Sequence, residues 1–222
     1  MIELNDLAYG VVTIPFSPRE KNAREILRQI EAETKFMQVD NPRPRHNSLY
    51  NHYFCWKKLL SSGKTYLTLM QDDIILTNNF SQKHLKSLNS LSHDHRIISF
   101  FSMATKKSTR AVAEGKSYFR SFGYSDQCAT LHCTVVARML TLFDEILGPT
   151  PREYWQELGL TRPKNLGWDS FWNHYCRELD SEYKPIYAIP DLVQHDVDKF
   201  DSSIGNPNKG KGLGRISWTF EP

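Results

Sequence analysis

The chain of 222 residues contains few cysteines, and none of them stands close to another in a metal-binding spacing. No CxxC or CxxxC pair occurs among Cys55, Cys128, Cys133 and Cys176. Zinc knuckles and disulfide frameworks depend on such regular spacings, so both kinds of site are disfavoured. We therefore expect buried structural thiols in a reducing compartment.

Long apolar runs are missing as well. No segment approaches the roughly 18 to 20 uninterrupted apolar residues that a membrane span requires. The first six residues contain no basic region followed by an apolar one, which is the pattern of a secretion signal. We expect a soluble protein that is not secreted.

Apolar residues are nevertheless plentiful, at 40% of the chain, and aromatic residues make up 12%. This composition excludes disorder and is sufficient for one compact core, so we expect a single domain over residues 1–222. The formal charge is only +3, but it is unevenly distributed. Residues 209–215 form a basic, glycine-rich tail, in which Lys209 and Lys211 are candidates for binding an anion.

Strand-like and helix-like segments alternate along the first hundred residues. Runs of apolar and β-branched residues predict strands over residues 9–14, 35–39, 65–70 and 96–101. Apolar residues at helical spacing predict helices after Ser17, around Trp56 and from Phe80 to Leu91, the first with a capping box between Ser17 and Glu20. The alternation favours an α/β fold with a mostly parallel central sheet flanked by helices.

The second half of the chain is less regular. Residues 102–127 lack a clear period and predict a long loop over one edge of the site. A strand is predicted over residues 128–136 and a helix over residues 139–147. The clearest amphipathic helix runs from Trp168 to Leu179, and after residue 190 the sequence is typical of a tail.

Two adjacent carboxylates, Asp72 and Asp73, directly follow the predicted strand 65–70. Burying carboxylates is costly, so a pair at this place usually handles a cation or a proton. In open α/β sheets ligands bind beyond the carboxyl ends of the strands, where these oxygens could hold Mg²⁺ or Mn²⁺ against a diphosphate. The alternative interpretation is a turn of solvated acids.

A second candidate is His195, which follows the apolar, strand-like segment 189–193. A histidine in this position could complete a metal or phosphate site when a tail folds over it, although a core or surface histidine is the plainer alternative. The nearby acids lack the glycine and the distal glutamate of a calcium loop, so we interpret them as solvated: Asp196, Asp198 and Asp201.

These two segments together resemble GT-A fold glycosyltransferases. Residues 69–76, Leu-Met-Gln-Asp-Asp-Ile-Ile-Leu, are similar to the DxD-type strand end of that family. The segment Pro190 to His195, with Ser-Ser-Ile-Gly at 202–205, is similar to its P-S-L-V/F-Q-H ending. The sequence departs from the pattern at Asp191, where serine is usual, and at residues 196–197, where Ile-Gly usually follows the histidine.

The resemblance implies a GT-A-like (Rossmann-like) fold and a nucleotide-sugar donor, with UDP-sugar as the expected type. It divides the chain into a donor-binding half (1–101), an acceptor half (102–189) and a flexible C-terminal tail or lid (190–222). Mn²⁺ or Mg²⁺ would be bound by Asp73 and His195. The donor would contact a set of residues from two strand ends: Thr13, Ile14, Pro15, Arg19 and Asp72.

An inverting transfer needs a base, and the resemblance implies Asp169 at the start of the strongest helix. A carboxylate there would equally serve as a helix cap that complements the helix dipole. Retaining chemistry is also compatible with the sequence.

The acceptor has two candidates by resemblance: hydroxymethylated pyrimidines in DNA for bacteriophage enzymes, and lipopolysaccharide or capsule sugars for bacterial ones. Both imply a cytoplasmic location, in a bacterium or a phage-infected host cell. Basic residues interleaved with aromatic ones could grip a phosphate backbone and stack a base. They are Arg43, Arg45, Lys106, Lys107, Arg110, Lys116, Arg120, Lys209, Lys211 and Arg215, with Tyr118, Phe119, Phe122 and Tyr124.

Two further functions remain open from the residues alone. A metal-dependent nuclease or phosphohydrolase could use Asp72, Asp73 and His195, although it usually needs a second metal with further acids. A DNA-binding accessory protein without catalytic activity could use the basic loops, but it would leave the paired aspartates without a role.

Overall fold

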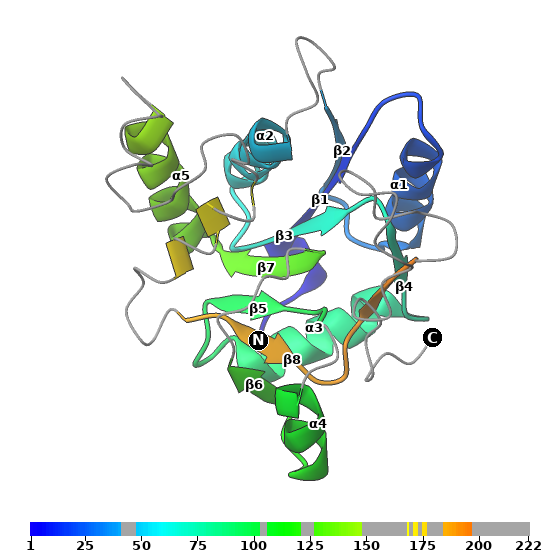
Figure 1. Ribbon diagram of the computed structural model, residues 1–222, viewed down its shortest axis with the longest axis vertical. Helices are drawn as coiled ribbons and strands as arrows, with labels where there is room; N and C mark the ends of the chain where they lie inside the picture. Colours follow the sequence, from blue (N-terminus) through cyan, green and yellow to red (C-terminus); the bar gives the residue numbers. More distant parts are fainter. Residues whose placement is uncertain are drawn as a thin grey trace.

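The computed structural model is built around a sheet with helices on both of its faces (Figure 1). It describes residues 1–40, 48–102, 106–120, 127–147 and 184–196, together with Trp168, Phe171, Trp172, Tyr175 and Cys176. In this part of the chain, no helix combines the length and the apolar character needed to cross a membrane.

The central sheet has seven strands in the order β2-β1-β3-β7-β5-β8-β6. Its strands β2, β1, β3, β5 and β8 run in one direction, while β7 and β6 run in the opposite one. The bounds are β1 Leu7–Thr13, β2 Lys35–Val39, β3 Tyr66–Gln71, β5 Ile97–Ser99, β6 Tyr118–Arg120, β7 Cys128–His132 and β8 Ile186–Ala188. The predicted α/β class with a mostly parallel central sheet is therefore confirmed.

Helices and a second, two-stranded sheet complete the fold. The short strands β4 (Ile74–Leu76) and β9 (Val193–His195) pair antiparallel beside the central sheet. The chain opens on a short 3-10 helix, η1. The helix bounds are η1 Leu4–Asp6, α1 Pro18–Gln29, α2 Ser48–Ser61, α3 Phe80–Leu91, α4 Lys106–Ala113 and α5 Cys133–Leu147.

Strand β1 shows why both faces of the sheet are covered. All seven of its residues are buried, and alternate side chains enter two separate apolar clusters. Ala8 and Val12 join the cluster of α2 and α5, whereas Leu7, Tyr9 and Val11 join the cluster of α1 and α3. A strand buried on both faces is apolar throughout, as is usual in parallel sheets. The aromatic residues of 168–176 join the first cluster, and all described positions there are helical, in agreement with the predicted amphipathic helix.

Two predictions for the middle of the chain are wrong. The predicted loop 102–127 contains helix α4 and strand β6. Helix α4 has eight residues and buries only Ser108 and Ala111, so it shows no stripe of large apolar residues. The predicted strand 128–136 ends at His132, and helix α5 begins at Cys133. The β-branched run Thr134 to Val136 suggested a strand, but Val135 and Val136 are buried in the first turns of the helix.

The start of α1 also differs from its prediction. Ser17 is the N-cap residue and Pro18 the first helical residue, as expected. The capping box does not form, because the Ser17 hydroxyl donates to the Ile14 carbonyl oxygen at 2.7 Å. Glu20 instead accepts a hydrogen bond from the Phe16 amide at 2.9 Å. Both side chains therefore fasten the β1–α1 turn rather than the helix end alone.

The cysteines lie where the composition suggested. Cys55, Cys128 and Cys176 are buried free thiols, and Cys133 is half-buried. Burial raises the pKa of each of the three buried thiols above its ordinary value. These side chains are therefore protonated packing residues at neutral pH.

Candidate functional site

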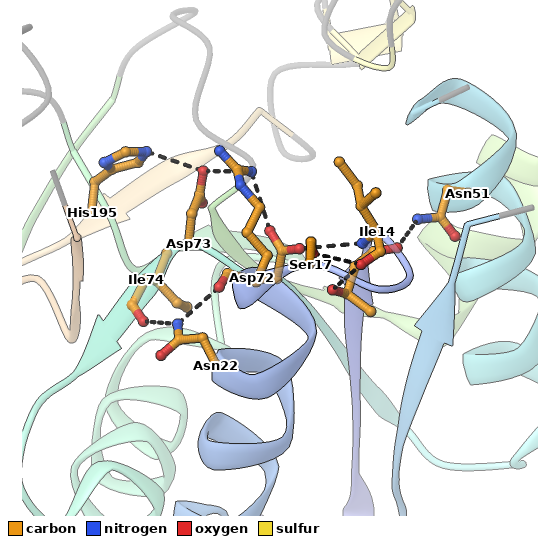
Figure 2. Close-up of polar contacts among 10 residues, drawn as sticks. Ile14, Ser17, Asn22, Asn51, Asp72, Asp73, Ile74 and His195 are labelled. Atoms are coloured by element: carbon orange, nitrogen blue, oxygen red, sulfur yellow. Dashed lines mark hydrogen bonds and ion pairs between the residues drawn. The ribbon is translucent and has the colours of Figure 1, made fainter. Parts of the chain in front are cut away.

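Asp72 and Asp73 occupy the turn between β3 and β4, at the carboxyl end of β3 (Figure 2). Each of these residues is only 4% exposed. Asn22 of α1 holds the turn from below, since its Nδ2 donates to the backbone oxygens of Asp72 at 2.8 Å and of Ile74 at 3.0 Å. The paired acids are therefore held rigidly inside the protein, and the interpretation as solvated turn residues is wrong.

Arg19, in the first turn of α1, bridges the two carboxylates. Its Nη1 lies 3.3 Å from Oδ1 of Asp72 and 3.1 Å from Oδ2 of Asp73. The helix N-terminus that carries Arg19 adds its own positive partial charge on the same side. One guanidinium and one helix end thus face the two buried carboxylates.

His195 reaches the same site from the opposite end of the chain. Strand β9 pairs with β4 so that His195 lies opposite Ile74, and the Asp196 amide donates to the Asp73 carbonyl oxygen at 2.8 Å. Nε2 of His195 lies 3.1 Å from Oδ2 of Asp73, and His195 is 1% exposed. The structure therefore brings together Asp73 and His195, which are 122 residues apart in the sequence.

The two aspartates differ in their electrostatic surroundings. Burial raises the pKa of Asp72, and the nearby Thr13 hydroxyl and Arg19 offset this only in part. Burial also acts to raise the pKa of Asp73, but the hydrogen bond from His195 and the charges of His195 and Arg19 outweigh it and bring the pKa below its ordinary value. Asp73 is therefore the carboxylate that stays ionised, as a metal ligand must.

The donor set fits a divalent cation that shares its coordination with a bound molecule. Among the described residues, Oδ1 of Asp73 is buried without a hydrogen-bond partner, and Nε2 of His195 lies beside the other oxygen of the same carboxylate. That part of the chain holds no group of three or more His, Cys, Asp or Glu side chains arranged as a complete metal cage. Mg²⁺ and Mn²⁺ do not need such a cage, because one or two carboxylates, water and substrate phosphates suffice.

The β1–α1 turn forms the adjoining wall of the site. The Ile14 amide lies 3.4 Å from Oδ2 of Asp72, and Asn51 of α2 donates to the Thr13 carbonyl oxygen at 3.2 Å. Thr13 is buried, while Ile14 and Pro15 are half-buried. Phe16 follows with a positive φ of 56° and is 99% exposed. The turn therefore carries an exposed aromatic residue two positions after Ile14, whose amide contacts Asp72.

No protein-family model matches the chain, and no curated protein sequence is similar to it at a significant level. Several solved structures share a similar fold. A glycosyltransferase involved in the glycosylation of the major capsid of PBCV-1 is 10% identical, with a TM-score of 0.40 over 68% of this chain and 74% of that one. The Drosophila β-1,4-galactosyltransferase 7 mutant in complex with manganese, UDP-Gal and xylobiose is 10% identical, with a TM-score of 0.44 over 91% and 78%.

A third structure belongs to a different group of enzymes. The 4-diphosphocytidyl-2C-methyl-D-erythritol synthase of Anaerococcus prevotii is 6% identical, with a TM-score of 0.39 over 87% of this chain and 94% of that one. Glycosyltransferases and nucleotidyltransferases are thus both among the similar structures. These similarities concern the fold alone.

Several residues of the site were not identified from the sequence. Asn22 lies three residues after Arg19, so the two side chains share one side of α1. This spacing could have identified Asn22 as a site residue. Asp40 follows β2 directly, is 8% exposed, and its amide donates to the Thr13 carbonyl oxygen at 2.9 Å. It is thus a further acid at the carboxyl edge of the sheet, which the predicted strand 35–39 could have revealed. Asn51 gave no signal.

Three predicted site residues lie outside the described residues: Asp169, Lys209 and Lys211. Trp168, next to Asp169, is described. Its ring is 1% exposed and stacks on His52 with the ring centroids 5.3 Å apart. The catalytic role of Asp169 and the anion-binding role of the two lysines stay predictions.

Proposed function

We propose that this protein is a glycosyltransferase that moves a sugar from a nucleoside-diphosphate sugar to an acceptor hydroxyl with the help of a divalent metal ion. One observation carries the proposal: two buried carboxylates at the carboxyl end of β3 converge with Arg19 and His195. This set combines an ionised carboxylate for a cation with a guanidinium for a phosphate. A leaving diphosphate requires both kinds of group.

Asp73 and His195 are the residues that would hold Mn²⁺ or Mg²⁺. When bound, such an ion neutralises the charge that develops on the leaving diphosphate. Nε2 of His195 lies 3.1 Å from Oδ2 of Asp73, so the two groups are close enough to bind one ion. Arg19 then supplies a fixed positive charge beside the ion.

The donor's nucleoside belongs in the β1–α1 wall. Asp40 and Thr13 lie at adjacent strand ends, where a carboxylate can accept hydrogen bonds from ribose hydroxyls. The exposed ring of Phe16 offers a flat surface for a base. Pro15 and Ile14 complete the wall, and UDP-sugar is the donor type that we propose.

The acceptor and the stereochemistry extend the same proposal. We assign the role of base to Asp169, which makes the transfer inverting. The acceptor hydroxyl belongs to a hydroxymethylated pyrimidine in DNA or to a lipopolysaccharide or capsule glycan. These two classes are separated by offering each to the enzyme with the identified donor.

The deciding experiment is thermal unfolding of the purified chain with UDP and Mn²⁺, separately and together. We expect the two ligands together to raise the Tm by more than the sum of their separate effects, because the ion bridges Asp73 and the diphosphate. The Asp73→Asn variant should lose this joint effect. Asp94→Asn is the matched control, because Asp94 is an exposed acid in the turn after α3.

A panel of nucleotide sugars then identifies the donor through metal-dependent release of the nucleoside diphosphate, which proceeds slowly by hydrolysis without acceptor. If neither UDP nor any other nucleoside diphosphate shifts the Tm in the presence of metal, the proposed donor site is wrong. Metal-dependent cleavage of a nucleic acid or a phosphoester by the same chain would instead support the phosphohydrolase alternative.

A further inference from the structure

A cleft lies between helix α4 and strand β6. Strand β6 forms the opposite edge of the sheet from β2, with α4 next to it (Figure 1). Its volume is about 580 Å³, within the range of roughly 300 to 1,000 Å³ that is typical of ligand sites. The lining comes from residues 107–120, one continuous helix, turn and strand. None of these residues takes part in the site around Asp73.

The lining is strongly basic. Four cations face the cleft, and Glu114 is the one acid among its lining residues. Four basic side chains against one carboxylate give the lining a formal charge of +3. The four cations are Lys107, Arg110, Lys116 and Arg120.

Glu114 forms ion pairs with two of these four cations. It accepts from Nε of Arg110 at 2.6 Å and from Nζ of Lys116 at 2.6 Å, which fixes the two cations side by side. Lys107 and Arg120 also line the cleft, and both are exposed. Cations spaced along a groove are the arrangement that tracks a chain of phosphates.

Two aromatic residues of β6, Tyr118 and Phe119, are among those that line the cleft. Phe119 stacks on Tyr187 of β8, with centroids 5.2 Å apart and an angle of 15° between the planes. Tyr118 packs against His95 at 4.7 Å. Both residues are half-buried, and their strand β6 forms an edge of the sheet. Neighbours fix their orientation, so stacking a base on them costs little ordering entropy.

We propose that this cleft binds single-stranded nucleic acid, with the cations on its phosphates and a base against Tyr118 or Phe119. A ligand that carries phosphate groups but no bases would need only the cations. The aromatic rings add flat apolar surface that every nucleobase can use, which favours a nucleic acid over a phosphorylated glycan. The inference does not depend on sugar transfer, since the cleft and the Asp73 site share no residue.

The test is fluorescence anisotropy of a labelled oligothymidylate of about 12 nucleotides with the full chain. We expect the Lys107→Gln/Arg120→Gln variant to weaken binding at least about fivefold and to lower the slope of log affinity against log salt by about 1.4, the value for two lost phosphate contacts. The matched control is Lys86→Gln/Arg138→Gln, which removes one exposed lysine and one exposed arginine from α3 and α5. It should bind like the unmodified chain.

An abasic oligonucleotide of the same length tests the aromatic contribution and should bind several-fold more weakly. Equal binding of the abasic chain overturns the nucleic-acid assignment, because it leaves a site for any polyanion. If both double variants weaken oligonucleotide binding equally, the cleft is not the binding site. Asp73→Asn should bind the oligonucleotide normally. The binding result can therefore be interpreted even if the proposed sugar transfer is wrong.

Discussion

Asp73 uses its two carboxylate oxygens very differently. Oδ2 faces both Arg19 and His195, while Oδ1 has no hydrogen-bond partner within the described part of the chain. Arg19 in turn serves Asp72 as well. A divalent cation that binds Oδ1 would compete with the guanidinium for the same negative charge. Metal binding at the proposed site would therefore be coupled to the Arg19 ion pairs.

This coupling predicts the behaviour of the Arg19→Gln variant. Loss of the guanidinium leaves two adjacent buried carboxylates with less counter-charge, so the metal-free protein should lose about 1 to 3 kcal/mol of unfolding free energy. Added Mn²⁺ should then stabilise the variant more than it stabilises the unmodified chain. Thermal unfolding with and without Mn²⁺ measures both effects.

The control for Arg19 is available on the same helix. Arg24 pairs with Glu20 at 2.7 Å, but its side chain is 64% exposed, so Arg24→Gln should change stability by less than about 0.5 kcal/mol. If Mn²⁺ stabilises the Arg19→Gln and Arg24→Gln variants by the same amount, the Arg19 guanidinium and the metal do not compete.

A second residue-scale prediction concerns pH and His84. This histidine is buried between the Tyr9 hydroxyl at 2.7 Å and the Thr130 hydroxyl at 2.9 Å, and burial lowers its pKa from 6.5 to about 3. The unfolded chain therefore binds a proton below pH 6.5 that the folded chain does not. Stability should fall as the pH drops from 6.5 toward 3, by about 2 kcal/mol at pH 5 from this group alone.

Urea unfolding at pH 7, 6 and 5 measures this slope. His84→Gln should be less stable at pH 7, because the hydrogen bonds to Tyr9 and Thr130 are disturbed, but its stability should depend less on pH over this range. An unchanged slope in the variant would assign the pH dependence to other groups. Asp73 contributes at lower pH: its lowered pKa stabilises the fold above the ordinary carboxyl range, and this is lost as the pH falls through the folded value.

At the scale of elements, the contact between β1 and α2 depends on a missing side chain. A Cβ added at Gly10 would lie 2.5 Å from Sγ of Cys55 and 3.3 Å from a methyl carbon of Leu59. Both of those residues are fully buried, so they have little room to move. Helix α2 can therefore rest directly on the strand only because residue 10 is glycine.

Gly10→Ala should destabilise the protein by about 1 to 3 kcal/mol through this overpacking. The cost should be smaller in a Cys55→Ala background, where the obstructing sulfur is absent. Chemical denaturation of the four chains of this double-mutant cycle gives the coupling directly. If the two costs simply add, the sulfur contact is not the cause of the destabilisation.

Elements with large apolar residues were predictable, and small or short ones were not. Strand β2 has its predicted bounds, and α3 spans the predicted Phe80 to Leu91, because each carries a clear apolar pattern. Helix α4 buries only Ser108 and Ala111, which a hydrophobic pattern does not register. The change from β7 to α5 at Cys133 falls inside a β-branched run, so only tertiary packing decides it.

At the scale of the whole molecule, the site joins segments that are far apart in the chain. The residues alone marked Asp72, Asp73 and His195 by their positions after apolar segments, and the family resemblance predicted that they belong to one site. Their contact depends on the register of β9 against β4, a long-range pairing that no local pattern specifies. The bridging position of Arg19 likewise requires α1 to lie against the β3–β4 turn, where Asn22 holds it. The candidate residues were therefore predictable from local sequence, whereas their assembly into one site was expected only from the family resemblance.

This long-range assembly predicts that ligands at Asp73 should tighten the C-terminal strand. The Asp196 amide donates to the Asp73 carbonyl oxygen, and the Leu192 amide donates to the Phe100 carbonyl oxygen, so movement of β9 must break contacts at the site. If UDP and Mn²⁺ bind at Asp73, we expect amide hydrogen exchange in the peptide 190–196 to slow about tenfold or more. Helix α4, at the other edge of the sheet, is the internal control and should exchange at an unchanged rate. Mn²⁺ alone should slow exchange less than UDP and Mn²⁺ together. The Asp73→Asn variant should show no slowing with either addition. Slower exchange over the whole chain, including α4, would indicate general stabilisation and contradict a specific link between Asp73 and β9.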